Sequence, residues 1–134
     1  MESQMSSRGR AVLVAAVLIP IGVGTKLYAG PGATWVVGSL GGSVYVMFWS
    51  FLALAIRPAW SPVRVAAVVL SGTVAIEFLQ RWHPPFLEAL RSTFLGKAVL
   101  GSVFSWMDLP FYAVGAVAAV VLARATIVPT SARP

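Results

Sequence analysis

The chain has 134 residues, of which 58% are hydrophobic and only 10% are charged, and its mean hydropathy is +0.85. This composition excludes an ordinary soluble domain, in which about a quarter of the residues are charged. The net charge of +6 is the difference between ten basic and four acidic residues, and the basic ones are scattered singly along the chain, so the charge predicts no nucleic-acid partner. Zero cysteines and a single histidine, His83, exclude thiol chemistry and histidine metal clusters, and we expect no metal or cofactor.

Four apolar runs are long enough to cross a membrane as helices, and they cover residues 11–28, 35–56, 63–80 and 109–128. They predict an all-α fold, a polytopic membrane four-helix bundle that occupies residues 1–134 as a single domain. The first run resembles a signal peptide, but its apolar core is longer than such peptides have. We therefore expect a retained helix, with cleavage near Ala29-Gly30 as the alternative, and we expect Pro20 to kink this helix without ending it.

The connection between the third and fourth runs is long and apolar. Two prolines, Pro84 and Pro85, end the preceding helix. The segment of about residues 86–107 contains an apolar stretch, 94–107, that is too short to span. It should lie in the membrane interface or enter the membrane as a re-entrant segment covered by protein, and we favour the re-entrant form.

Basic residues in the flanks predict the orientation through the positive-inside rule. One membrane side would hold Arg8, Arg10, Arg57, Arg64, Arg124 and Arg133, and the other would hold Lys26, Arg81, Arg91 and Lys97. The difference predicts that both termini are cytoplasmic. We expect a multi-pass protein of a bacterial cytoplasmic (inner) membrane, in contact with membrane lipids.

Scarce polar residues should gather at the opposite, outward side. In a four-span hairpin topology, the ends of helices one and three and the starts of helices two and four share one membrane side. This side would collect the polar residues Lys26, Glu77, Gln80, Arg91 and Asp108. A carboxylate inside a span costs about 2.5 to 3.5 kcal/mol on insertion scales, so Glu77 needs a partner or a wet cavity.

Each carboxylate has two interpretations. Glu77 could pair with Arg81, Arg91 or Lys26 simply to fix helix packing, and Asp108 could cap the fourth helix. Alternatively, Glu77 and Asp108 flank an outward-facing polar pocket, with Arg91 supplying a guanidinium fork suited to phosphate or carboxylate.

Small residues predict where helices approach closely. Gly38 and Gly42 are four residues apart near the start of the second span, and Gly115 and Ala119 repeat that spacing in the fourth. Such strips allow tight helix packing in membranes.

Four motifs carry a resemblance to known proteins: E-F-L-Q from Glu77, R-S-T-F-L-G from Arg91, L-G-S-V-F-S-W-M-D ending at Asp108, and F-Y-A-V-G from Phe111. The chain resembles, from Lys26 onward, a family of short bacterial four-helix membrane proteins of unknown function that sometimes carries a ribosomal-maturation label. It is also distantly similar to the VanZ-like group, which is associated with resistance to the glycopeptide teicoplanin.

The resemblance implies site residues and one departure. The implied residues are Glu77, Gln80, Arg91, Thr93, Asp108 and Tyr112, and Lys26 stands where the family tends to have arginine. Where that family usually has Gly-Asp at the start of helix two, this sequence has Gly41-Gly42. An acidic group expected at the site is therefore missing.

The sequence thus predicts a small integral membrane protein that binds a lipid or a cell-envelope precursor head group at an outward-facing polar site. The alternatives are a small proton-coupled transporter, which would be oligomeric, and an accessory subunit of a larger membrane complex. No nucleophile motif or metal-ligand set identifies an enzyme.

Overall fold

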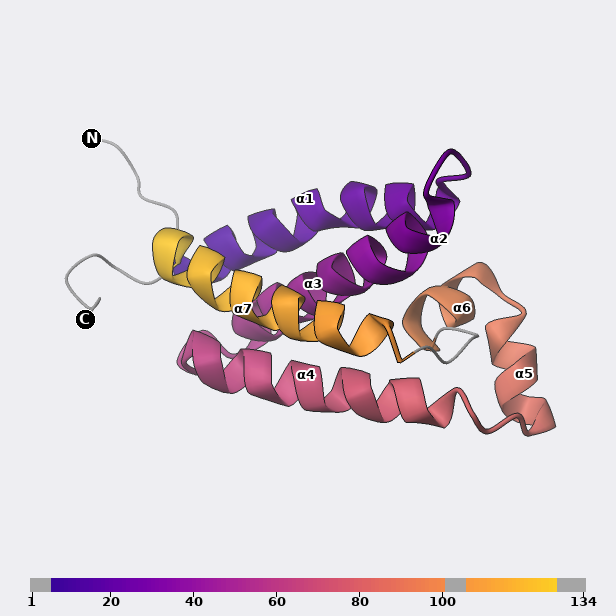
Figure 1. The fold of residues 1–134 in the computed structure, drawn as a ribbon. Helices are drawn as coiled ribbons and strands as arrows, with labels where there is room; N and C mark the ends of the chain where they lie inside the picture. The colour runs from indigo at the N-terminus through magenta and orange to yellow at the C-terminus, as the bar shows by residue number, and fades with distance from the viewer. Residues whose placement is uncertain (1–5, 101–105, 128–134) are drawn as a thin grey trace.

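The computed structural model describes residues 6–100 and 106–127, and every regular element in these ranges is helical (Figure 1). The elements are α1 (Ser7–Leu27), α2 (Ala33–Trp35), the π-helix η1 (Val36–Leu40), α3 (Gly41–Ile56), α4 (Pro62–Leu79), α5 (Pro85–Arg91), α6 (Phe94–Leu100) and α7 (Asp108–Thr126). Because α2, η1 and α3 follow one another without a break, they form one helix, Ala33–Ile56. The predicted all-α class is confirmed for these residues.

Four helices are long and apolar enough to cross a membrane: α1, Ala33–Ile56, α4 and α7. The first begins earlier than predicted because Ser6 caps it, its Oγ accepting a hydrogen bond from the Gly9 amide at 3.0 Å. Pro20 lies inside α1 and does not end it. Residue 128, the predicted end of the last run, lies outside the described residues.

α3 is the central helix, and it packs against α1, α4 and α7. Half of the most apolar 18-residue stretch of Ala33–Ile56 is buried, whereas the corresponding fraction is 22 to 28% for each of the three surrounding helices. The surrounding helices turn the rest of their apolar side chains outward, as Val17, Val68 and Val117 illustrate. The bundle is therefore apolar on its outside as well as in its core.

Glycines bring α3 and α7 into contact. A Cβ atom placed on Gly115 would lie 2.5 Å from the Ser43 carbonyl oxygen, and one on Gly42 would lie 2.7 Å from Cε1 of Tyr112. The Ser43 hydroxyl donates to the Phe111 carbonyl at 2.7 Å across the same interface. The predicted close approach of these glycine-containing helices is confirmed.

Arginines hold the end of the bundle where α1 begins. Arg8 Nε donates to the Ala55 carbonyl at 2.9 Å, and Arg10 Nη1 donates to the Thr126 carbonyl at 3.1 Å. These carbonyls lie in the last turns of α3 and α7, where the backbone lacks intrahelical partners and the helix dipole favours cations. Arg133, predicted for the same side, lies outside the described residues.

At the other end, the predicted 86–107 segment contains the two short helices α5 and α6 (Figure 1). Pro85 is the first residue of α5, where its missing amide costs nothing. Among the described residues, hydrogen bonds attach α6 to the bundle from the Tyr45 hydroxyl to the Val99 carbonyl (2.6 Å) and from Gln80 Nε2 to the Leu100 carbonyl (2.8 Å). Residues 101–105 of this segment lie outside the described residues.

The glycine contact between α3 and α7 can be tested by adding one methyl group. Gly115→Ala should lower the free energy of unfolding by about 1 to 3 kcal/mol, because the new Cβ meets backbone atoms that cannot rotate away. Gly72→Ala is the matched control, since nothing lies within 4 Å of a Cβ at that helical position. The control should be neutral or stabilising by up to about 1 kcal/mol. Thermal unfolding in detergent measures both, and equal stability of the two variants would contradict the packing described.

Candidate ligand-binding cavity

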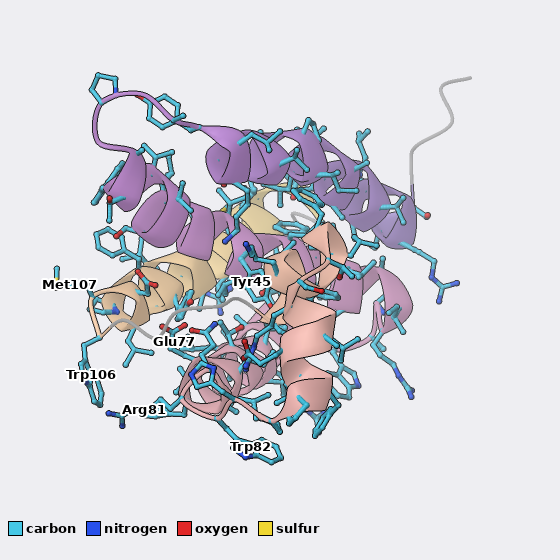
Figure 2. All side chains as sticks on the ribbon, turned by 90° about the vertical axis from the view of Figure 1, so that its right-hand side faces the viewer. Tyr45, Glu77, Arg81, Trp82, Trp106 and Met107 are labelled. Atoms are coloured by element: carbon cyan, nitrogen blue, oxygen red, sulfur yellow. The ribbon has the colours of Figure 1, made fainter. Side chains whose placement is uncertain are left out.

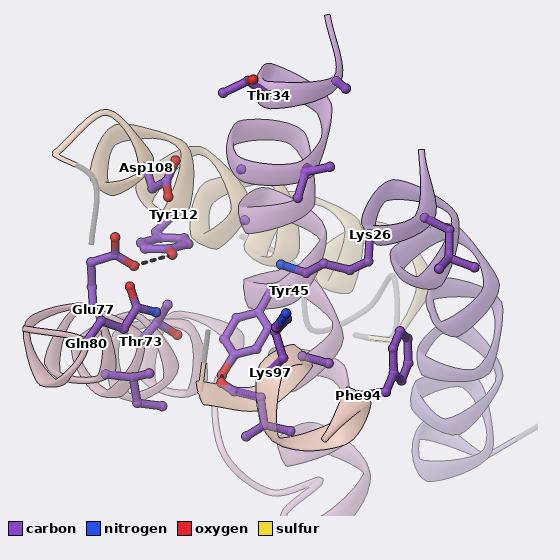
Figure 3. Close-up of a pocket in the computed structure, with 18 residues that line it drawn as sticks. Lys26, Thr34, Tyr45, Thr73, Glu77, Gln80, Phe94, Lys97, Asp108 and Tyr112 are labelled. Carbon is purple, nitrogen blue, oxygen red and sulfur yellow. Dashed lines mark hydrogen bonds between the residues drawn. The ribbon is translucent and has the colours of Figure 1, made fainter. Parts of the chain in front are cut away.

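A cavity of about 660 Å³ lies at the end of the bundle that carries α5 and α6 (Figure 3). The end of α1, the helix Ala33–Ile56, the end of α4, α6 and the start of α7 all contribute side chains to it. Its polar lining residues are Lys26, Thr34, Tyr45, Thr73, Glu77, Gln80, Lys97, Asp108 and Tyr112, and its apolar ones include Leu27, Val37, Ile76, Phe94 and Val99. The size falls within the range typical of small-molecule sites.

The most buried polar group of the cavity is Glu77, which is 1% exposed. The Tyr112 hydroxyl donates to Glu77 Oε2 at 2.6 Å, and Figure 3 shows this bond joining α4 to α7. The Tyr112 ring can reach this position because it lies directly over Gly42, where a side chain would collide with it. Glu77 is thus held in place from a neighbouring helix, and it lies in the cavity lining.

Asp108 lies in the first turn of α7 and not at its N-cap, which is Met107. A carboxylate in this turn is favoured by the helix dipole without capping the helix. Its Oδ1 would lie 3.0 Å from a Cβ atom on Gly38, so the acid approaches η1 where that helix has no side chain. η1 is a π-helix, a local widening that often occurs at functional sites.

Gln80 presents an unused acceptor. Its side chain is 6% exposed, and its Nε2 donates to the Leu100 carbonyl at 2.8 Å. Its Oε1 is buried and accepts no hydrogen bond from the described residues. Figure 3 shows this oxygen on the same side of the cavity as Glu77 and Tyr112. A buried acceptor without a donor costs about 1 to 3 kcal/mol, so a ligand that supplies a donor is favoured here.

Two lysines lie across the cavity from the acids. Lys26 extends from the last turn of α1 and Lys97 from α6, and their ammonium ends converge near Tyr45 (Figure 3). Both side chains are exposed, and neither ammonium is within ion-pair distance of a carboxylate among the residues that the structure describes. The cavity therefore has a cationic side and an acidic side.

Two of the predicted site residues do not line the cavity. Arg91 is 4% exposed and donates to the carbonyls of Leu79 (3.2 Å) and Trp82 (2.9 Å) and to Glu88 Oε1 (2.9 Å). It therefore caps the end of α4. Thr93 lies just before α6, where its Oγ1 caps the first turn. The other five predicted residues, Lys26, Glu77, Gln80, Asp108 and Tyr112, come together in the cavity.

Sequence reasoning missed Tyr45 and Thr73 as parts of the lining. Tyr45 is one turn beyond Gly41-Gly42, and Thr73 is one turn before Glu77, so the i,i+4 spacing from residues already singled out was the available signal. The sequence predicted the correct end of the bundle for Lys97. That its side chain lines the cavity depends on the course of α6, which the sequence did not predict.

The lining does not resemble a metal site. Within residues 6–100 and 106–127, no three histidine, aspartate or glutamate side chains lie close enough together to hold an ion. What the cavity offers is two ammonium groups, two carboxyl groups, an amide oxygen and a tyrosine hydroxyl. This set is suited to binding a polar group that carries charge of both signs.

Comparison with known proteins identifies the family. The model of the family described as "Protein of unknown function (DUF2809)" matches residues 32–116, and the chain belongs to this family. The predicted resemblance to a family of unknown function is thus confirmed at that level. The matched range includes every described cavity-lining residue except Lys26 and Leu27 of α1. No solved structure matches the chain.

The bond between Tyr112 and Glu77 should stabilise the bundle. Tyr112→Phe keeps the ring over Gly42 and removes only the hydroxyl, so it should lower the free energy of unfolding by about 1 to 3 kcal/mol. Tyr28→Phe is the matched control because that hydroxyl makes an exposed bond to the Pro31 carbonyl. Thermal unfolding measures both. An unchanged stability of Tyr112→Phe would contradict the conclusion that this hydrogen bond holds Glu77 in place.

The carboxylate of Glu88, which lies between His83 and the buried Arg91, should make stability depend on pH. Hydrogen bonds with His83 (2.8 Å) and then Arg91 (2.9 Å) hold the pKa of Glu88 below its ordinary value. The ionised carboxylate is thus favoured in the folded state, and its contribution is complete above the ordinary carboxyl pKa and is lost as the pH falls through the lowered one.

Glu88→Gln should therefore be less stable than the parent chain at neutral pH, with the difference closing in acid. Melting temperatures from neutral pH to about pH 3 measure this effect. A difference that stays constant over the whole range would show that the carboxylate charge does not contribute.

Proposed function

We propose that this protein is a multi-pass membrane protein whose cavity binds the polar head group of a lipid or a cell-envelope precursor. The observation that carries the proposal is the position of the cavity. Charged side chains gather at one end of a bundle whose outer surface is otherwise apolar, so a charged head group and an apolar tail would each meet a suitable surface.

The outer surface of the bundle supports insertion in a membrane. α1, α4 and α7 expose aliphatic side chains along their lengths, including Val12, Leu13, Val17, Ile19, Val63, Val68, Val114, Val117 and Val121. Soluble monomers rarely expose so many large apolar side chains on their helices. Exposed tryptophans near the cavity end, Trp35, Trp82 and Trp106, suit the position of a membrane interface.

Charge supports an outward-facing cavity. The opposite end carries Arg8, Arg10, Arg57, Arg64 and Arg124, against Lys26, Arg81, Arg91 and Lys97 at the cavity end. Under the positive-inside rule both termini are cytoplasmic, and the cavity faces the outer leaflet of the cytoplasmic membrane. The proposal also places the protein in a bacterial cell envelope and includes a distant relationship to the VanZ-like group.

The lining supports recognition of a phosphate-bearing amphiphile. Lys26 and Lys97 both line the cavity and form no ion pair with any carboxylate of the described residues, which leaves two ammonium groups to meet an anion there. Leu27, Phe94 and Val99 provide apolar surface beside them, against which the first carbons of an acyl or isoprenoid chain would pack.

The lysines provide the test. We expect Lys26→Gln combined with Lys97→Gln to weaken binding of phospholipid to the purified protein at least about tenfold, because each charge-assisted hydrogen bond contributes about 1.5 to 3 kcal/mol. Native mass spectrometry of the detergent-solubilised full chain, with defined phospholipids added, measures the affinity. Arg57→Gln combined with Arg124→Gln is the matched control because it removes two exposed charges from the opposite end.

Equal lipid binding by both double variants would overturn the proposed function. Flux of protons or solutes in proteoliposomes that depends on Glu77 would instead favour the transporter. Copurification of a stable partner, with no lipid dependence on the lysines, would favour the accessory subunit.

A further inference from the structure

We infer that the ligand of this cavity is zwitterionic, a phosphate ester that also carries a primary ammonium group, with the phosphate between Lys26 and Lys97 and the ammonium beside Gln80, Glu77 and Asp108. This inference rests on the proposed function and names the class of head group. It follows from three features: the separation of charge within the cavity, the unpartnered oxygen of Gln80 and the number of acceptors around it.

The separation of charge comes first. Figure 3 shows the lysine ammonium ends on one side of the cavity, and the carboxylates of Glu77 and Asp108 on the other. A purely anionic ligand would meet the lysines favourably and the two acids unfavourably. A ligand with both charges would meet an opposite charge at each end. The described lining contains two lysines and two acids, so its formal charges sum to zero. A head group with no net charge leaves that sum unchanged.

The second feature is the oxygen of Gln80. The side chain is 6% exposed, and its amide nitrogen is already engaged with the Leu100 carbonyl. That bond fixes the orientation of the amide, which leaves Oε1 on the cavity side without a donor from the described residues. The phosphate has no hydrogen to offer this oxygen, whereas an ammonium group has.

The third feature distinguishes a primary from a quaternary ammonium. A primary ammonium carries three N–H donors, and the acidic side of the cavity offers acceptors on Gln80, Glu77 and Asp108. A quaternary ammonium has no N–H donor and is bound by cages of aromatic rings. The described aromatic lining residues do not surround the acids: Figure 3 shows Tyr112 beside them, and Tyr45 and Phe94 on the lysine side of the cavity.

The experiment compares three phospholipids with identical acyl chains and different head groups: phosphatidylethanolamine, phosphatidylglycerol and phosphatidylcholine. We expect the full chain in detergent to bind the ethanolamine lipid at least about tenfold more tightly than either of the others, as measured by native mass spectrometry. Tighter or equal binding of the glycerol or choline lipid would overturn the inference.

Two substitutions at one position separate recognition from folding. Gln80→Leu removes the acceptor and should abolish the preference for the ethanolamine lipid. Both Gln80→Leu and Gln80→Glu lose the donor to the Leu100 carbonyl. Gln80→Glu keeps acceptor oxygens, so it should retain the preference for the ethanolamine lipid. Loss of the preference in both variants would assign the effect to the Leu100 bond and overturn the inference. Asp108→Asn, at a half-buried position, should reduce the preference without removing a packing contact.

The outcomes also separate this inference from the proposed function on which it rests. Lysine-dependent binding of all three lipids with equal affinity would preserve the proposed function and overturn the zwitterionic class. Binding of none of them would overturn both. Soluble glycerophosphoethanolamine distinguishes the source of the head group: affinity equal to that of the lipid would support the zwitterion and overturn its assignment to a membrane lipid.

Discussion

The contact among Gly42, Tyr112 and Glu77 is the constraint on which the rest of the structure depends. It joins three helices: the ring of Tyr112 on α7 lies on the bare backbone of α3, and its hydroxyl reaches the carboxyl group of Glu77 on α4. A buried carboxyl group is costly unless it is hydrogen-bonded, so Glu77 depends on the position of α7. That position in turn depends on the lack of a side chain at Gly42. The same three residues therefore contribute both to the wall of the cavity and to the packing of α3, α4 and α7.

Arginine and lysine have different places in this molecule. Arg8, Arg10 and Arg91 each donate to backbone carbonyls in or just beyond the last turns of α3, α7 and α4, respectively. The planar guanidinium, with its several fixed donors, suits the unpaired carbonyls at a helix end. Within residues 6–100 and 106–127, Lys26 and Lys97 make no such bond to a carbonyl, and their compact charges reach the cavity on flexible stems. These three arginines thus bind helix ends, while the two lysines line the cavity.

The sequence predicted the elements well because long apolar runs have few interpretations. Four such runs, bounded by proline, glycine and basic residues, predicted helices whose bounds differ from the structure by only a few residues. Hairpin topology also predicted which helix ends share a side, and five of the seven proposed residues line one cavity. The role of Arg91 could not be predicted this way. Whether it reaches the cavity or the end of α4 depends on the path from Trp82 to α5, which the spacing of residues does not determine.

Position 42 shows how one small residue connects packing with the chemistry of the cavity. The family resemblance led us to expect an acid there, and its absence could be interpreted as the loss of a functional group. The geometry gives the glycine a role of its own, because any side chain at this position would begin 2.7 Å from the Tyr112 ring. An aspartate would displace Tyr112 from Glu77, and it would also add a third acid to a lining that has two lysines and two acids. With glycine, Tyr112 supplies a neutral hydroxyl where the acid would be, and the charges of the two sides remain equal. Glycine at position 42 therefore agrees with the proposal of a ligand that bears both charges.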